Sequence, residues 1–166
     1  ASKVLLSEKN VSLFEKHCVL SRKELESRYE VMLENYIKTI NIEALTTLEM
    51  AKRDILPAVF GFAGSLADSI NSIKATGMGV DVSAQSELLS EVSSTASSFK
   101  KGIASLESVL EKASSMDDDL YDQAMAFRNE VFTAMQELRD CGDKLETITD
   151  SDFWPFPTYG DMLFRV

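Results

Sequence analysis

The fold is decided by residues 21–77, which read SRKELESRYEVMLENYIKTINIEALTTLEMAKRDILPAVFGFAGSLADSINSIKATG. Ser21 and Glu24 have the spacing of a capping box, in which each side chain bonds the backbone N–H of the other residue at the start of a helix. From there apolar residues recur in steps of three and four, which places them on one face of an α-helix. Gly77 then offers the left-handed conformation that often ends a helix. The stretch therefore predicts one helix over about residues 22–76.

Pro57 lies inside this predicted helix. Proline has no backbone N–H, and its ring clashes with the carbonyl of the preceding turn, so we expect a kink near residues 53–57. Gly61 and Gly64 follow closely. They lower the helix propensity of this part of the chain but permit a neighbouring helix to approach closely. The pattern favours a packed kink over a hinge.

Two more helices are expected after residues 77–82. Ser83 can cap a second helix that extends to about residue 115. This segment contains eleven serines, which are mediocre helix formers, so packing rather than propensity must stabilise the helix. A third helix is expected to begin at the aspartates of residues 117–119, which suit the positive end of a helix dipole, and to end near residue 149. Its apolar residues form a heptad-like seam, at Leu120, Ala124, Phe127, Val131, Ala134, Leu138, Cys141, Leu145 and Ile148.

The connections between these helices are short, so consecutive helices are expected to be antiparallel neighbours. The first helix would be about 80 Å long, against about 45–50 Å for each of the other two. The second helix would then cover only residues 45–76 of the first. We predict an all-α, elongated antiparallel three-helix bundle with one very long kinked helix, a short N-terminal helix at about residues 7–18, and an aromatic C-terminal tail.

Residues 22–44 would project beyond this bundle, and their apolar side chains are not confined to one face. They are Tyr29, Val31, Met32, Leu33, Tyr36, Ile37, Ile40 and Ile42. The short N-terminal helix can cover only part of such a surface, and uncovered apolar surface of this breadth marks an interaction site. We therefore predict an interface at Tyr29, Leu33, Tyr36 and Ile40.

Residues 150–166 differ from the rest of the chain because they combine aromatic residues with two prolines, Pro155 and Pro157. The prolines end the third helix and hold the following chain extended. We predict a tail that folds over the bundle, with the anchors Trp154, Phe156, Tyr159 and Phe164. Docking of the tail onto a neighbouring subunit or another domain is the alternative.

Composition limits the partners. The 166 residues have a formal net charge of −10, which argues against a nucleic-acid partner because such a partner requires a basic surface. No run of eighteen apolar residues is present, so no membrane partner is expected. Cys18 and Cys141 are far apart in the sequence and are predicted to be free thiols in a reducing cytoplasm, although spacing alone does not exclude a bridge.

The sequence contains no recognisable set of catalytic, cofactor-binding or metal-binding residues. His17 is the single histidine, and its neighbour Cys18 does not by itself indicate a catalytic pair. The Glu-x-x-His motif of di-iron bundles and the glycine-rich loops that bind phosphates are absent. The aspartates of residues 117–122 lack the spacing of a calcium-binding loop. A bundle that senses a metal or a small molecule is therefore disfavoured.

Three stretches of the chain are similar to one known family. Residues 143–164, DKLETITDSDFWPFPTYGDMLF, resemble the C-terminal ending of type III glutamine synthetases. Residues 10–45 resemble the segment that follows the catalytic barrel in that family, and AKRDILPAV at residues 51–59 fits the long helix of its C-terminal extension. The resemblance covers essentially the whole chain, and its most specific part is WPFPTYGDMLF.

This resemblance implies that the chain is a fragment of an ATP-dependent glutamate–ammonia ligase. Residues 1–44 would be the trailing segment of the catalytic domain, residues 45–149 a C-terminal helical bundle, and residues 150–166 the docked tail. The family joins ammonia to glutamate through a γ-glutamyl phosphate, with ATP and Mg²⁺ or Mn²⁺ bound in a catalytic domain that would precede this chain. None of those site motifs is present here.

The partners implied by the resemblance are the chain's own catalytic domain and neighbouring subunits of a ring-shaped homo-oligomer. The sequence leaves open whether the extension is regulatory or purely structural. It also leaves open a rival interpretation, in which the chain is a free-standing helical coiled-coil scaffold that mediates interactions.

Overall fold

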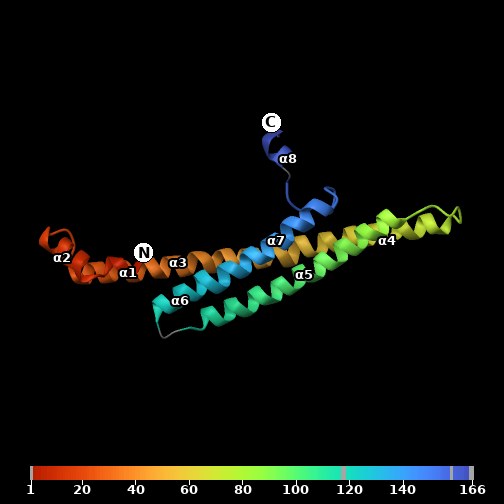
Figure 1. Cartoon of the computed structure of the whole chain (residues 1–166). Coiled ribbons are helices and arrows are strands. Elements are labelled where there is room, and N and C mark those ends of the chain that lie inside the picture. Colours follow the sequence, from red (N-terminus) through yellow and green to blue (C-terminus); the bar gives the residue numbers. More distant parts are fainter. Residues whose placement is uncertain (1, 117–118, 158, 165–166) are drawn as a thin grey trace.

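The computed structural model describes residues 2–116, 119–157 and 159–164, without the side chains of residues 2, 3, 159 and 164. These residues form helices and no strand (Figure 1). In chain order the elements are α1 (Ser2–Leu5), α2 (Glu8–Lys16), α3 (Arg22–Met50), the π-helical turn η1 (Ala51–Ile55), α4 (Leu56–Ala75), α5 (Ser83–Ser114), α6 (Leu120–Ala126), the π-helical turn η2 (Phe127–Val131), α7 (Phe132–Ile148) and α8 (Tyr159–Phe164). The predicted all-α bundle is confirmed.

The elements α3, η1 and α4 follow one another without a break and form the long helix predicted from the sequence. The capping box is present at its start: the Ser21 N–H donates to Glu24 Oε2 at 2.7 Å, and the Glu24 N–H donates to Ser21 Oγ at 3.4 Å. At its end Gly77 has a φ of +69°, the left-handed conformation expected there. Both ends of the helix are therefore determined by local chemistry.

The expected disturbance near Pro57 takes the form of the π turn η1. The Leu56 N–H bonds to the carbonyl of Ala51, five residues back rather than four. An unbroken α-helix would press the Pro57 ring against the carbonyl of Arg53, and the wider π turn lies at this point. The long helix thus continues through the proline instead of breaking. A second π turn, η2, lies between α6 and α7 in a segment without proline, where no local signal predicts it.

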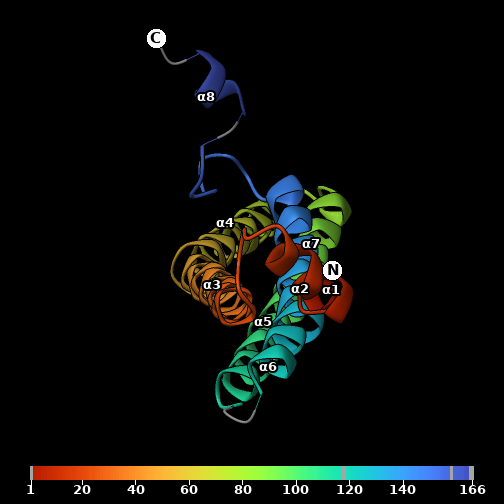
Figure 2. The same cartoon turned by 90° about the vertical axis from the view of Figure 1, so that its left-hand side faces the viewer.

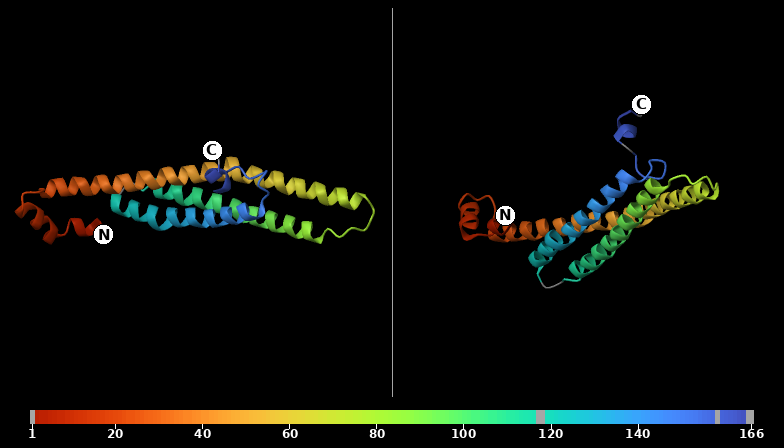
Figure 3. Two further views of the ribbon diagram at one scale, coloured as in Figure 1. Left: turned by 90° about the horizontal axis from the view of Figure 1, so that it is seen from above. Right: turned by 45° about the vertical axis from the view of Figure 1, so that its right-hand side comes forward.

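The helix α5 runs back along α4 and α3, and α6, η2 and α7 return in the opposite direction beside α5 (Figures 1 and 3). One core joins all three layers. Its fully buried members come from every long helix: Ala44, Ala51, Val59, Val92, Phe99, Ile103, Leu106, Phe127, Val131, Leu138 and Leu145. Of the heptad-like seam predicted for the third helix, the residues from Phe127 to Ile148 lie in this core or against it.

Two glycines allow α5 and α7 to pack closely. A Cβ atom on Gly102 of α5 would lie 3.2 Å from Leu138 Cδ1, and one on Gly142 of α7 would lie 3.4 Å from Phe99 Cε2. Each helix therefore presents a glycine to a large side chain of the other. This reciprocal arrangement holds the antiparallel pair at short range.

The start of α5 differs from the prediction. Ser83 is the first helical residue rather than the cap, and the carboxylate of Asp81 accepts both the Ser83 N–H at 2.9 Å and the Ser83 hydroxyl at 3.0 Å. These hydrogen bonds hold the pKa of Asp81 below its ordinary value. At the next helix the prediction of an aspartate start is met by Asp119, which accepts the Tyr121 N–H at 2.7 Å; residues 117–118 lie outside the described residues.

The expectation that residues 22–44 project uncovered is wrong for the face of α3 that points toward the other helices. Leu25, Leu33 and Ile40 are all buried. At the start of α3, the short helices α1 and α2 fold back against it, and Val11 of α2 is also buried. Farther along, α6 begins beyond the end of α5, so that Leu120 reaches the same hollow as Leu33. Helix α6 therefore covers α3 beyond the point where α5 ends.

The close approach of α5 and α7 makes a testable prediction. Gly102→Val places a branched side chain against Leu138, so we expect it to lower the free energy of unfolding by about 1–3 kcal/mol. The matched control is Gly64→Ala on α4, where a Cβ meets nothing within 4 Å. That control is expected to raise stability by about 0.5–1 kcal/mol through helix propensity alone. Urea denaturation of both variants is the measurement, and equal effects would contradict the packing described.

The capping box makes a second prediction, about acid. Hydrogen bonds from the backbone and hydroxyl of Ser21 hold the pKa of Glu24 below its ordinary value. A carboxylate whose pKa is lowered by folding contributes stability above its unfolded pKa, about 4.3, and this contribution is lost as the pH falls through the folded pKa. The melting temperature of the parent should therefore exceed that of Glu24→Gln at pH 7, and the difference should shrink toward pH 3. A pH-independent difference would exclude this role for the carboxylate.

Candidate interface surfaces

Within residues 2–116, 119–157 and 159–164, no three His, Cys, Asp or Glu side chains gather where they could hold a metal ion. His17 and Cys18 are exposed at the turn after α2, and both cysteines are free thiols. Among the described helices, none is long and apolar enough to cross a membrane.

The four residues predicted as an interface do not share one surface. Leu33 and Ile40 are buried within the chain, with 6% and 7% of their surface exposed, because α6 and the core helices cover them. Tyr29 is half-buried in a hollow that it shares with Leu6, Leu120 and Tyr121. Burial raises the pKa of the Tyr29 hydroxyl, and Tyr121 and Asp119 add to this effect. Tyr36 is the member of the set that remains exposed.

A different set of apolar side chains on α3 is open to solvent. We define the outer stripe as Val31, Met32, Tyr36, Ile42 and Leu45, whose exposed fractions lie between 36% and 64%. Successive residues of an α-helix are rotated by about 100°, so residues two positions apart point in nearly opposite directions. Val31 therefore points away from Leu33, and Ile42 points away from Ile40. Val31 and Ile42 therefore lie on the side of α3 opposite the core, whereas Tyr36 lies beside Leu33 and Ile40. Leu45 borders a hollow that it shares with Leu110 of α5. The outer stripe extends about 21 Å along the helix.

The outer stripe is not flat at its N-terminal end. Ser27, Arg28, Val31, Met32 and Asn35 surround a shallow hollow of about 370 Å³. A side chain from another part of a protein could enter it. An interface in this region stays a prediction. Two of its predicted residues, Leu33 and Ile40, are buried within the chain, because periodicity alone does not show which side of a helix its neighbours will cover.

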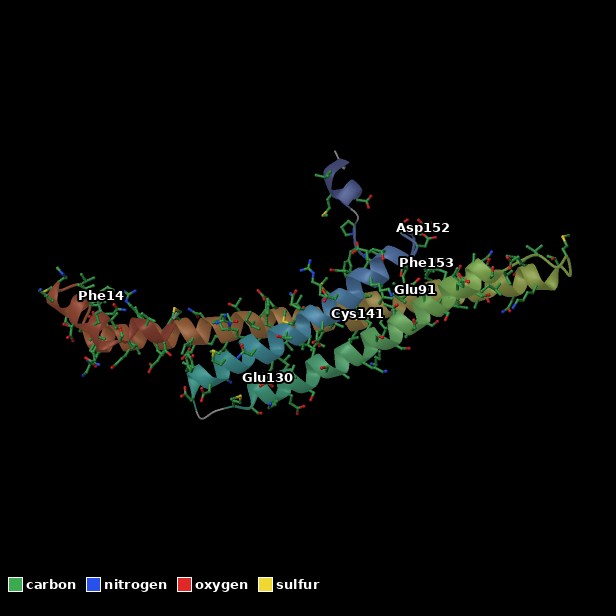
Figure 4. The ribbon with its side chains drawn as sticks, in the orientation of Figure 1. Phe14, Glu91, Glu130, Cys141, Asp152 and Phe153 are labelled. Carbon is green, nitrogen blue, oxygen red and sulfur yellow. The ribbon has the colours of Figure 1, made fainter. Side chains whose placement is uncertain are left out.

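The first part of the tail docks on its own bundle, as predicted. The rings of Phe153 and Phe62 are 5.8 Å apart with an interplanar angle of 55°, and Figure 4 shows Phe153 and Asp152 at the turn that follows α7. Trp154 packs against the core, and its ring meets Phe156 edge-on at 6.2 Å. Residues 153–156 thus form a clasp over the bundle where α7 ends.

The second part of the tail does not dock. Helix α8 stands away from the bundle (Figures 1 and 2), and its residues Met162 and Leu163 are 58% and 72% exposed. This corrects the expectation that the tail as a whole turns inward, because the extended segment through Pro155 and Pro157 directs the chain outward. The side chains of the predicted anchors Tyr159 and Phe164 lie outside the described residues.

A groove of about 520 Å³ lies between the α3–η1 segment and α7. Trp154 and Phe156 of the clasp line it, and Phe99 and Leu138 contribute from the core. Its remaining apolar lining is Met50, Ala51, Ile55, Phe132 and Met135, and its polar lining is Glu43, Thr47, Gln136, Arg139, Asp143 and Glu146. Sequence reasoning missed this groove, since it requires two helices and the tail to come together.

Comparison with known proteins relates the sequence of this chain to one family. Residues 1–74 match the family described as the glutamine synthetase C-terminal domain. Over 97% of its length the chain is 30% identical to a glutamine synthetase of Butyrivibrio fibrisolvens, and over 95% it is 32% identical to a type-3 glutamine synthetase of Dictyostelium discoideum. A glutamine synthetase of Bacteroides fragilis is 25% identical over 88% of the chain. The predicted relation to type III glutamine synthetases is confirmed.

The chain spans only part of these relatives. Its matched residues account for 23%, 22% and 20% of the length of the three proteins. The family match at residues 1–74 contains the whole of α3, and therefore the whole outer stripe.

The clasp makes a prediction that the chain's single tryptophan can report. A Cβ on Gly61 would lie 3.4 Å from the Phe153 ring, so Gly61→Leu should displace Phe153 and loosen Trp154 behind it. We expect the fluorescence emission of Trp154 to shift to longer wavelength as the indole becomes more exposed to water. The matched control is Gly64→Leu, one turn farther along α4 and without neighbours within 4 Å. An unchanged spectrum for Gly61→Leu would show that the clasp is not formed.

Proposed function

We propose, for a chain related along nearly its whole length to type III glutamine synthetases, that it is the non-catalytic helical C-terminal region of such an enzyme. In this proposal the outer stripe of α3 packs against the part of the enzyme that precedes it, and so supports the catalytic domain and the assembly of subunits. The parent enzyme would join ammonia to glutamate with ATP and Mg²⁺ or Mn²⁺, all bound outside this chain. The two free cysteines favour the cytoplasm as its location.

The observation that carries the proposal is the exposed outer stripe. Five large apolar side chains remain open to solvent along one helix whose other face is fully packed. Each contributes about 1 kcal/mol if the exposed half of its surface is covered. Exposed apolar side chains gathered along one element are typical of interaction sites.

The comparisons favour the preceding part of the same enzyme as the occupant. The outer stripe lies within residues 1–74, the part of the chain that matches the glutamine synthetase C-terminal domain. The relatives are at least four times longer than the segment they share with this chain. A large remainder of the enzyme is thus available to cover the stripe.

The proposed division at residue 44 places the start of α3 with the catalytic domain. That residue lies within α3, and the helix passes through it without interruption. A rigid helix that belongs to both parts would transmit the position of one to the other. The divisions at residues 44 and 149 stay predictions.

The proposal predicts that the outer stripe is required for assembly. In a full-length type III enzyme that ends in this chain, Val31→Ser, Ile42→Ser and Leu45→Ser together should reduce the assembled fraction and, in parallel, the rate of glutamine formation. Light scattering and a glutamine assay measure the two quantities. Circular dichroism of the isolated triple variant should remain that of the parent, since more than half of each of the three side chains is exposed.

A matched control replaces Phe60, Met78 and Val80 with serine. These side chains are as exposed as the stripe but lie on α4 and in the loop after it. The control should assemble and react like the parent. If the stripe variant also assembles and reacts normally, the proposal is wrong and the free-standing scaffold becomes the better account.

A further inference from the structure

The chain presents both an uncovered apolar plug and an uncovered apolar groove. The plug is the pair Met162 and Leu163 on α8, and the groove is the one between the α3–η1 segment and α7. We propose that α8 of one chain docks in the groove of a second copy, whose own α8 docks in return. This exchange uses neither the outer stripe nor any other part of the parent enzyme, so it stands or falls separately from the proposed function.

The groove presents exposed apolar side chains beside the clasp. Trp154 and Phe156 occupy one part of its wall, and Met50 and Phe132 remain 38% and 43% exposed. The half-buried Met135 lies beside them. Methionine side chains adapt their shape to an incoming apolar group, which suits a groove that has to accept a helix.

The plug has no cover among the described residues of its own chain. Met162 and Leu163 are neighbours on α8, and the helix stands off the bundle in two perpendicular views (Figures 1 and 2). Leu163 exposes a larger fraction of its surface than any residue of the outer stripe, and Met162 a larger fraction than all of them except Ile42. Two such residues at the end of a projecting arm are in position to enter a surface outside the molecule that carries them.

The prolines favour a second copy over closure within one chain. Trp154 and Phe156 each precede a proline, which biases both residues toward extended backbone and away from a turn. Only two residues, one of them Pro157, separate Phe156 in the groove from the start of α8. The chain would have to reverse its direction within those two residues for α8 to lie in its own groove. An arm that leaves its own bundle extended is suited to exchange between identical subunits.

Charge favours contact through the tail rather than through the bundles. Each chain has a formal net charge of −10, so two bundles that pack face to face repel each other. The segment at residues 159–164 has one charged residue, Asp161, and the tail therefore adds little to this repulsion. The rim of the groove holds one cation, Arg139, which pairs with Asp143 at 3.6 Å, and the carboxylates of Glu43 and Glu146, so apolar contact rather than charge has to hold α8 there.

The exchange buries two small plugs, so the surface area buried between the two chains is well below the area of about 1,200–2,000 Å² that stable complexes bury. The dimer should therefore be weak when only this contact holds it, and its fraction should rise with protein concentration. Sedimentation velocity of the 166-residue chain over a wide range of concentrations measures this fraction. We expect a monomer–dimer equilibrium.

Two pairs of substitutions test the contact from both sides. The tail variant combines Met162→Ser with Leu163→Ser, and the groove variant combines Met50→Ser with Phe132→Ser. Each should weaken dimerisation at least about tenfold. The control variant, Phe60→Ser with Met78→Ser, removes equally exposed apolar groups elsewhere and should dimerise like the parent. All six positions are exposed, so the helical circular dichroism should be retained in each variant.

Mixing the two variants distinguishes exchange from indirect effects. The groove variant keeps an intact α8, and the tail variant keeps an intact groove, so an equimolar mixture can form one of the two contacts. Native mass spectrometry of the mixture, with one variant isotopically labelled, should show a mixed dimer more abundant than either dimer of like variants. A parent that stays monomeric at every concentration would overturn the proposal. So would a dimer indifferent to the tail substitutions, or a tail variant that is less stable as a monomer, which would indicate closure of α8 on its own chain.

Discussion

A helix of more than fifty residues with an apolar side chain at every third or fourth position is stable in water only if other helices run along its apolar face. The segment from Arg22 to Ala75 imposes that requirement, and the short helices before it and the helices α5 to α7 meet it. Helix α5 covers α4 and the end of α3, α6 and α7 continue the cover toward the start of α3, and α1 with α2 close the first turns. Removing any of these elements would expose a different stretch of the same apolar face.

The same requirement explains what remains open. The other helices of this chain cover one side of the long helix and leave part of its opposite side exposed. The outer stripe of α3 and the plug on α8 are left uncovered, and they are the features that the proposed contacts use. Both lie on helices of the part of the chain that the structure describes, at opposite sides of the bundle's sequence. A continuous helix that carries the stripe at one end and the bundle at the other connects these two parts rigidly.

Local signals in the sequence predicted the structure well, and long-range packing decided the rest. The capping box at Ser21, the left-handed Gly77 and the disturbance before Pro57 depend on neighbours within about five residues, and all three are present. Leu33 and Ile40 were assigned to an interface because nothing in their neighbourhood shows that α6, much later in the chain, covers this part of α3. The groove and the outward course of α8 depend in the same way on where the clasp meets the bundle. The family, by contrast, could be identified from the amino-acid sequence, above all from the ending WPFPTYGDMLF.

The central claim is that the outer stripe of α3 is a contact surface for the rest of a type III glutamine synthetase. An electron cryomicroscopy map of the full-length enzyme that ends in this chain tests it most directly. The account predicts that Val31, Ile42 and Leu45 are buried against residues that precede this chain, while Leu33 and Ile40 stay packed against α6 and the core helices. A map in which the stripe faces solvent in the assembled enzyme would contradict it.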